Sequence, residues 1–111
     1  MSWKVNTRSE IYLAEKSRTE GNEGRARVCA RRAAGYIIAE YLRREGLGAK
    51  EISAISLLRS LQSLPDIRPE VKEVAGHFLV RVTTDHQLPV GADLIAEARW
   101  LAEELLGERL D

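Results

Sequence analysis

The stretch Glu23–Glu45, EGRARVCARRAAGYIIAEYLRRE, decides the fold of this 111-residue chain. Small or apolar residues recur in it at three- and four-residue spacing: Ala26, Ala30, Ala33, Ile37 and Tyr41. This spacing places them on one side of an α-helix, and no proline interrupts the pattern. We therefore predict a helix over 23–45, the longest in the protein.

The middle of this predicted helix carries little side-chain bulk, because Ala33, Ala34 and Gly35 follow one another. Such a segment allows a neighbouring helix to approach closely, and the alternative is a channel of small residues that holds a ligand. Cys29 lies on the apolar side and is expected to be a small core residue. A nucleophilic pair of Cys29 with His77 or His86 is the alternative for that residue.

Turn signals on either side divide the rest of the chain into further helical segments. We predict helices over 7–19, 50–62 and 91–106, and a fourth segment that begins with Pro69 at its first helical position. Gly107 is the expected end of the last helix. The apolar residues assigned to the third and fourth segments are Ile52, Ile55, Leu57, Leu58 and Leu61, and Val71, Val74, Ala75, Phe78, Leu79 and Val82.

Two short runs rich in strand-forming residues, 36–39 and 77–82, lie inside longer helical patterns, so helix is preferred there. The sequence contains no internal repeat and no linker rich in Gly, Pro and Ser. We predict an all-α fold, an antiparallel bundle of four to five helices, with residues 1–111 forming a single domain.

The composition favours a folded protein in a reducing compartment. Hydrophobic residues make up 44% and charged residues 31% of the chain, and Cys29 is its single cysteine. We find no apolar run long enough to span a bilayer, and the first residues lack the apolar run of a signal peptide, so we expect no leader sequence. We expect a cytoplasmic protein without a membrane association. No Cys/His spacing indicates a metal site, and we expect no metal and no cofactor.

Charge is distributed unevenly although the net charge is zero. Residues 1–48 hold 10 Lys/Arg and 6 Asp/Glu, and residues 49–111 hold 7 and 11. Four arginines cluster at the start of the long helix, and they are candidates for binding a nucleotide or another phosphate: Arg25, Arg27, Arg31 and Arg32. The alternative is that they form ion pairs with the acidic residues of the last helix: Asp93, Glu97, Glu103 and Glu104.

Arg81 and His86 are the candidate catalytic residues. An arginine can hold a phosphate and stabilise its developing negative charge, and a histidine can transfer a proton at neutral pH. The pair therefore suits RNA phosphodiester cleavage. The alternative is an ordinary helix end, and Glu73, His77 and Arg81 are then expected to form a ladder of charged side chains at four-residue spacing.

Several segments together resemble the HEPN-domain family. The segment Gly24–Ala34 is similar to the second helix of these proteins, and the serine- and leucine-rich 53–61 and the closing 93–103 are similar in type and order. Arg81 and His86, with four residues between them before the last helix, resemble the Arg-x4-6-His motif of the family. The resemblance covers roughly residues 10 to 106 as a pattern of helix lengths and residue types.

The resemblance implies a helical bundle that forms a homodimer. Family members are either metal-independent RNases, with Arg81 and His86 in the catalytic roles here, or binding companions of small nucleotidyltransferases. Val82 departs from the RNase pattern, in which a polar residue follows the arginine. We therefore expect a homodimeric module that binds a nucleotide or a small nucleotidyltransferase. A toxin-like RNase acting on RNA, or a structural interaction protein without a ligand, is the alternative.

Overall fold

The computed structural model describes residues 2–48, 53–80 and 92–110. These residues form five helices: α1 (Trp3–Thr19), α2 (Glu23–Arg44), α3 (Ala54–Ser63), α4 (Pro69–Leu79) and α5 (Leu94–Leu106). No strand occurs in the described part of the chain, so the predicted all-α bundle is confirmed. The helix predicted over 23–45 is α2, which is the longest of the five, with 22 residues.

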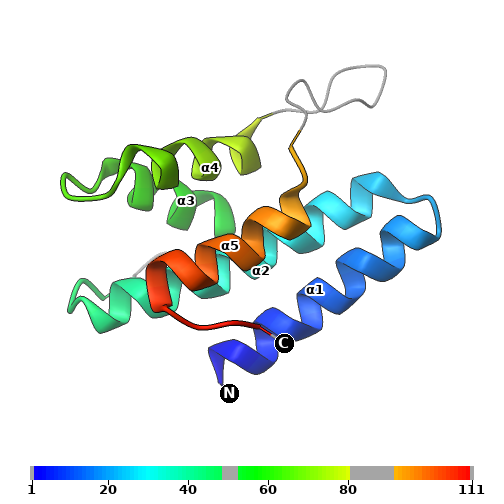
Figure 1. Ribbon diagram of the computed structural model, residues 1–111, viewed down its shortest axis with the longest axis horizontal. Coiled ribbons are helices and arrows are strands. Elements are labelled where there is room, and N and C mark those ends of the chain that lie inside the picture. The colour runs from blue at the N-terminus through cyan, green and yellow to red at the C-terminus, as the bar shows by residue number, and fades with distance from the viewer. Residues whose placement is uncertain (1, 49–52, 81–91, 111) are drawn as a thin grey trace.

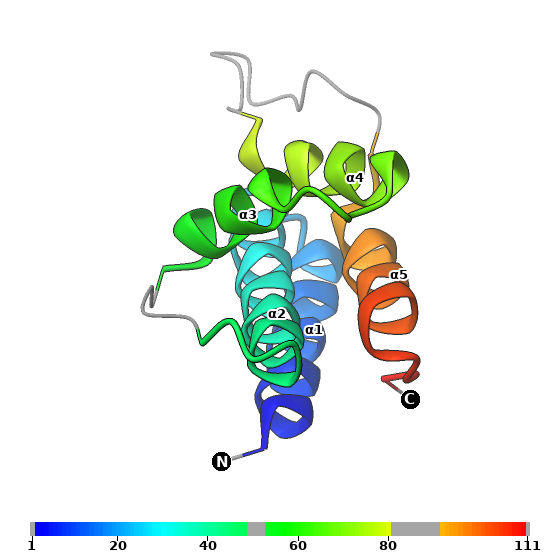
Figure 2. The ribbon, with the colours of Figure 1, turned by 90° about the vertical axis from the view of Figure 1, so that its left-hand side faces the viewer.

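The helices are arranged as two hairpins and one additional helix (Figures 1 and 2). α1 and α2 are antiparallel and pack along their length, and α5 lies beside both of them. α3 and α4 form the second hairpin, in which α3 contacts α2 and α4 contacts α5. The α3–α4 hairpin therefore covers one side of the layer formed by α1, α2 and α5.

Local capping explains where the helices begin and end. Asn22, Ser53 and Asp93 each accept a hydrogen bond from a backbone N–H of the first turn that follows, which satisfies donors that have no partner within the helix. Gly107 ends α5 with φ of 66°, a left-handed conformation that glycine adopts without a steric cost. The predicted positions of Pro69 at a helix start and Gly107 at a helix end are confirmed.

The first residues of three helices differ from the prediction. α3 begins at Ala54 instead of residue 50, directly after Ser53, whose side chain caps it. α1 begins at Trp3 instead of Thr7, because Ser2 accepts a hydrogen bond from the N–H of Lys4 at 3.2 Å. Thr7 is then inside the helix and fully buried, and its hydroxyl donates to the carbonyl of Trp3. α5 begins at Leu94, later than predicted, because Asp93 caps it.

The core contains side chains from all five helices. Its largest fully buried members are Ile37, Ile38, Leu58, Leu61, Phe78, Leu101 and Thr7. Cys29 is also in the core, with 2% of its surface exposed, as predicted. Burial raises the pKa of the Cys29 thiol, because the charged thiolate is poorly solvated there.

The close helix approach predicted at the small residues of α2 occurs at Gly35. A Cβ atom added to Gly35 would lie 3.0 Å from the Cβ and 3.2 Å from the Cα of Ala54, in the first turn of α3. A side chain at position 35 would therefore push α3 away from α2. Since Ala54 occupies this contact, the neighbouring Ile55 is directed to the surface, and its predicted place in the core is wrong.

Charged residues hold the C-terminal end of α2 to its neighbours. Arg44 donates to Glu40 at 2.8 Å and to Glu108 at 2.7 Å, and Lys4 of α1 lies 3.4 Å from the same Glu108. The guanidinium of Arg44 also lies over the ring of Trp3, 5.9 Å from its centroid. This network joins α1, α2 and the residues that follow α5.

Candidate functional site

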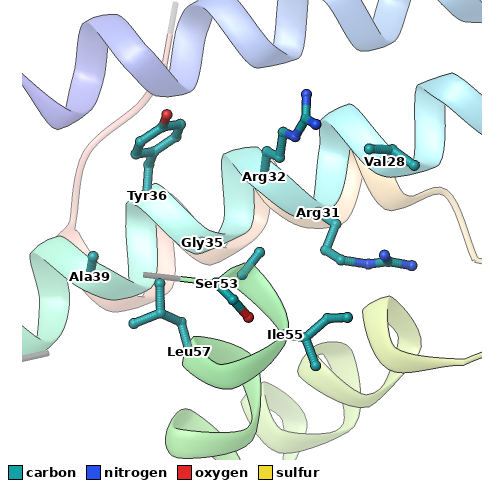
Figure 3. Close-up of a pocket in the computed structure, with 10 residues that line it drawn as sticks. Val28, Arg31, Arg32, Gly35, Tyr36, Ala39, Ser53, Ile55 and Leu57 are labelled. Carbon is teal, nitrogen blue, oxygen red and sulfur yellow. The ribbon is translucent and has the colours of Figure 1, made fainter. Parts of the chain in front are cut away.

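A groove with a volume of about 540 Å³ lies between α2 and α3 (Figure 3). α2 contributes two adjacent rows of residues to it, Val28, Arg32 and Tyr36 in one row and Arg31, Gly35 and Ala39 in the other. α3 contributes its first turn and the residue that caps it: Ser53, Ala54, Ile55 and Leu57. The contact of Gly35 with Ala54 closes the groove at its base.

The groove exposes apolar side chains that a folded protein ordinarily buries. Val28, Tyr36 and Ile55 are each about 40% exposed and lie around the same cavity. An exposed apolar cluster bordered by charged groups is typical of a binding site, because contact with a ligand or partner removes the apolar surface from water. The cavity volume is within the range of small-molecule sites.

The groove has a positive charge that the described residues do not neutralise. Arg31 is half-buried, and its Nε donates to the carbonyl oxygen of Phe78 at 3.1 Å. Arg32 is exposed and makes no hydrogen bond or ion pair within residues 2–48, 53–80 and 92–110. None of the described residues that line the groove is acidic. The two guanidinium groups are therefore available to an anionic ligand.

Figure 3 shows how these side chains are directed. Arg32 and Tyr36 stand next to each other on the outer row of α2 and point away from α3. Arg31 points in the other direction, past Ile55 toward α4. A ligand in the groove would therefore contact an aromatic ring and an arginine along one border and a second arginine at one end.

The other two predicted phosphate-binding arginines lie elsewhere. Arg25 is exposed at the start of α2. It lies close enough to Cys29 to lower the pKa of the Cys29 thiol, although burial raises that pKa by more. Arg27 is half-buried, and its Nε has no hydrogen-bond partner. Neither residue lines the groove, so the structure brings only Arg31 and Arg32 of the predicted cluster to it.

The arginine cluster does not form the alternative ion pairs with α5 among the described residues. Asp93 pairs with Arg18 at 3.0 Å, Glu104 with Arg68 at 2.7 Å and Glu103 with Arg109 at 3.2 Å. Glu97 lies 2.9 Å from Nδ1 of His77. The acidic residues of α5 are thus occupied by other partners, which leaves the positive charge at the groove in place.

His77 pairs with Glu97 of α5, so the step of the predicted ladder that lies within the described residues, Glu73 with His77, is not formed. Both carboxylate oxygens of Glu97 are 2.9 Å from the His77 ring, and the two side chains are mostly buried. This interaction joins α4 to α5 instead of joining residues of one helix. Arg81, the third member of the predicted ladder, lies outside the described residues.

The candidate catalytic pair, Arg81 and His86, lies wholly outside the described residues. Its role in RNA cleavage therefore stays a prediction. Within the described ranges, no group of three or more His, Cys, Asp or Glu side chains is arranged to hold a metal ion. None of the helices in those ranges combines the length and the apolar character needed to cross a bilayer.

Sequence reasoning missed Val28 and Ile55 as groove residues and did not assign Tyr36 to a site. Val28, Arg32 and Tyr36 follow one another at four-residue spacing on the side of α2 opposite its core, and this is the signal that could have indicated them. Ile55 gave no such signal, because its exposure depends on how α3 meets Gly35.

Comparisons with protein-family models, with curated proteins and with solved structures find no match to this chain.

Proposed function

We propose that this protein is a HEPN-like helical module that binds a nucleotide in the groove between α2 and α3. The observation that carries the proposal is the combination of two arginines without an acidic partner and three exposed apolar side chains around one cavity. A nucleotide has the complementary parts, an anionic phosphate and a flat ring. The resemblance to the HEPN family supports the same ligand class.

The phosphate is expected to contact Arg32, since its guanidinium is exposed and makes no other hydrogen bond in the described part of the chain. Hydrogen bonds between a guanidinium and a phosphate are short and strong, and several can form at once. The base is expected to stack on Tyr36, one helical turn further along the same row. Ile55 and Val28 extend the apolar surface on which the ligand lies.

We also propose that the chain forms a homodimer and associates with a small nucleotidyltransferase. A twofold contact through the groove would cover the proposed nucleotide site. The dimer contact is therefore assigned to another surface. This arrangement leaves the groove of each copy accessible.

A titration with adenosine monophosphate tests the binding site. We expect amide NMR signals of residues 28–39 and 53–57 to shift, and we expect Arg32→Ala to weaken binding roughly tenfold or more, because a hydrogen bond to a charged group contributes about 1.5–3 kcal/mol. Tyr36→Ala should also weaken binding, and Tyr36→Phe should retain it because the ring is kept.

Arg25→Ala is the matched control. Arg25 is an exposed arginine on the same helix that does not line the groove, so its removal changes the net charge by the same amount without touching the site. If Arg25→Ala weakened binding as much as Arg32→Ala, the nucleotide would be attracted by the overall positive charge of the protein. The groove would then not be the nucleotide-binding site. If no nucleotide shifted these signals, the proposed function would be wrong.

A further inference from the structure

The two ends of the groove differ in chemistry. The end at Val28, Arg31 and Arg32 carries all of its positive charge, whereas Gly35, Ala39 and Leu57 make the other end apolar. Arg31 and Ala39 are eight residues apart on α2, which corresponds to about 12 Å along a helix. The groove therefore matches a ligand with an anionic group at one end and an uncharged, flat part at the other.

The cationic end is bordered by the C-terminal end of α4. The carbonyl oxygen of Phe78, in the last turn of α4, accepts the hydrogen bond from Arg31 Nε at 3.1 Å. The backbone leaves helical geometry at Val80, so the last carbonyls of α4 have no partners within the helix. These carbonyls carry the partial negative charge of a helix C-terminus.

This contact has two consequences for an anion. Part of the positive charge of Arg31 is already offset by the carbonyl group, while its two Nη atoms remain without a hydrogen-bond partner among the described residues. In addition, a second or third phosphate extending past Arg31 would approach the carbonyl oxygens at the end of α4. Their partial negative charge would repel the negatively charged phosphate. Arg32 is the one groove arginine in the described structure whose charge is not shared in this way.

We infer that the groove is selective for a ligand with a single phosphate group at its cationic end, bound by Arg32 with Arg31 beyond it, and with its ring along Tyr36 toward Ala39 and Leu57. This inference rests on the proposed function and specifies its ligand. A nucleoside monophosphate and the phosphorylated end of an oligonucleotide both supply this chemistry. A nucleoside triphosphate is disfavoured although it carries more negative charge.

The test compares the affinities of adenosine, AMP, ATP and a 5′-phosphorylated adenine dinucleotide, measured by NMR titration at constant ionic strength in EDTA. AMP is expected to bind at least tenfold more tightly than adenosine, and ATP no more tightly than AMP. Tighter binding of AMP than of the dinucleotide assigns the free mononucleotide as the ligand, and the reverse assigns an oligonucleotide end.

The variant Val80→Lys tests the physical cause. A cation at the end of α4 offsets the negative charge of its carbonyls, so the affinity for ATP relative to AMP should rise at least threefold. Ser63→Lys is the control, because it adds the same charge at the C-terminal end of α3, remote from the first turn that lines the groove. Both proteins are first checked for the signal dispersion of the folded bundle.

Tighter binding of ATP than of AMP by the wild-type protein would overturn the single-phosphate inference and leave nucleotide binding standing. An unchanged ATP-to-AMP ratio in Val80→Lys would refute the role of the α4 terminus. Absence of binding by all four compounds would refute the proposed function itself, and the ligand assignment with it. The wild-type series decides the inference even if the variants do not fold.

Discussion

At the scale of single residues, Gly35 determines both the packing of α3 and the shape of the groove. Its missing side chain allows Ala54 to approach the backbone of α2, and the groove opens directly beside this contact. Interiors packed at this density do not absorb an added methyl group without a shift of the neighbouring atoms. The stability of the bundle and the geometry of the site therefore depend on the same residue.

We predict that Gly35→Ala lowers the free energy of unfolding by about 1–3 kcal/mol, since the new Cβ would meet the backbone and side chain of Ala54. Chemical denaturation measures the change. Gly24→Ala is the control, because the nearest atom to its added Cβ is 3.8 Å away. At that position the loss of glycine flexibility in the unfolded chain should leave stability unchanged or increase it by up to about 1 kcal/mol. Equal effects of the two substitutions would contradict the close-approach argument.

At the scale of helices, the end of α2 is held by charge pairs. Hydrogen bonds from Arg43 and Arg44 lower the pKa of Glu40 to about 2, and the hydrogen bond from Arg44 also lowers the pKa of Glu108. A carboxyl group whose pKa is lower in the folded state contributes stability above its unfolded pKa, near 4.3, and loses it as the pH falls. The contribution of Glu40 is thus present at neutral pH and is lost between about pH 4.5 and 2.

We predict that the free energy of unfolding of the wild-type protein falls more steeply than that of Glu40→Gln as the pH is lowered from 5 to 2. The two stabilities should approach each other at the acid end, because protonation removes the charge of Glu40 that pairs with Arg43 and Arg44, and glutamine lacks this charge at every pH. Urea denaturation at a series of pH values gives both slopes. Glu45→Gln provides a comparison at an exposed carboxylate just beyond the same helix. Parallel pH dependences of wild type and Glu40→Gln would show that the pairing contributes nothing.

At the scale of the whole molecule, the groove exists because the α3–α4 hairpin packs against α2. The other sides of α2 form part of the core. α2 packs against α1 and α5 on its other sides, and the groove forms only where α3 meets its outer rows. α4 then supplies the carbonyl group that orients Arg31. The proposed ligand therefore contacts two helices and is influenced by the end of a third.

We predict that the protein in solution has twice the mass of the 12.5 kDa chain, as the proposed homodimer requires. Light scattering coupled to size-exclusion chromatography measures this mass. Arg32→Ala and Tyr36→Ala should leave it unchanged, because the dimer contact is assigned to a surface other than the groove. A monomeric mass would remove the homodimer from the proposal, and a mass that fell in these two variants would place the contact at the groove.

The sequence by itself determined the helical class, the extent of α2 and the burial of Cys29. These features follow from local properties of the chain: periodic apolar spacing, the absence of proline within 23–45, and the residues able to cap a helix. It also indicated that an arginine-rich segment begins α2. It did not determine which of those arginines share a site.

The tertiary structure decided the site. It separated Arg31 and Arg32 from Arg25 and Arg27, and it placed Ile55 at the surface. It also paired the acidic residues of α5 with Arg18, His77, Arg68 and Arg109 instead of the arginine cluster. The physical reason is that these outcomes depend on which helices meet and at what register. Contacts between residues far apart in the chain set that register, and the periodicity of one helix does not.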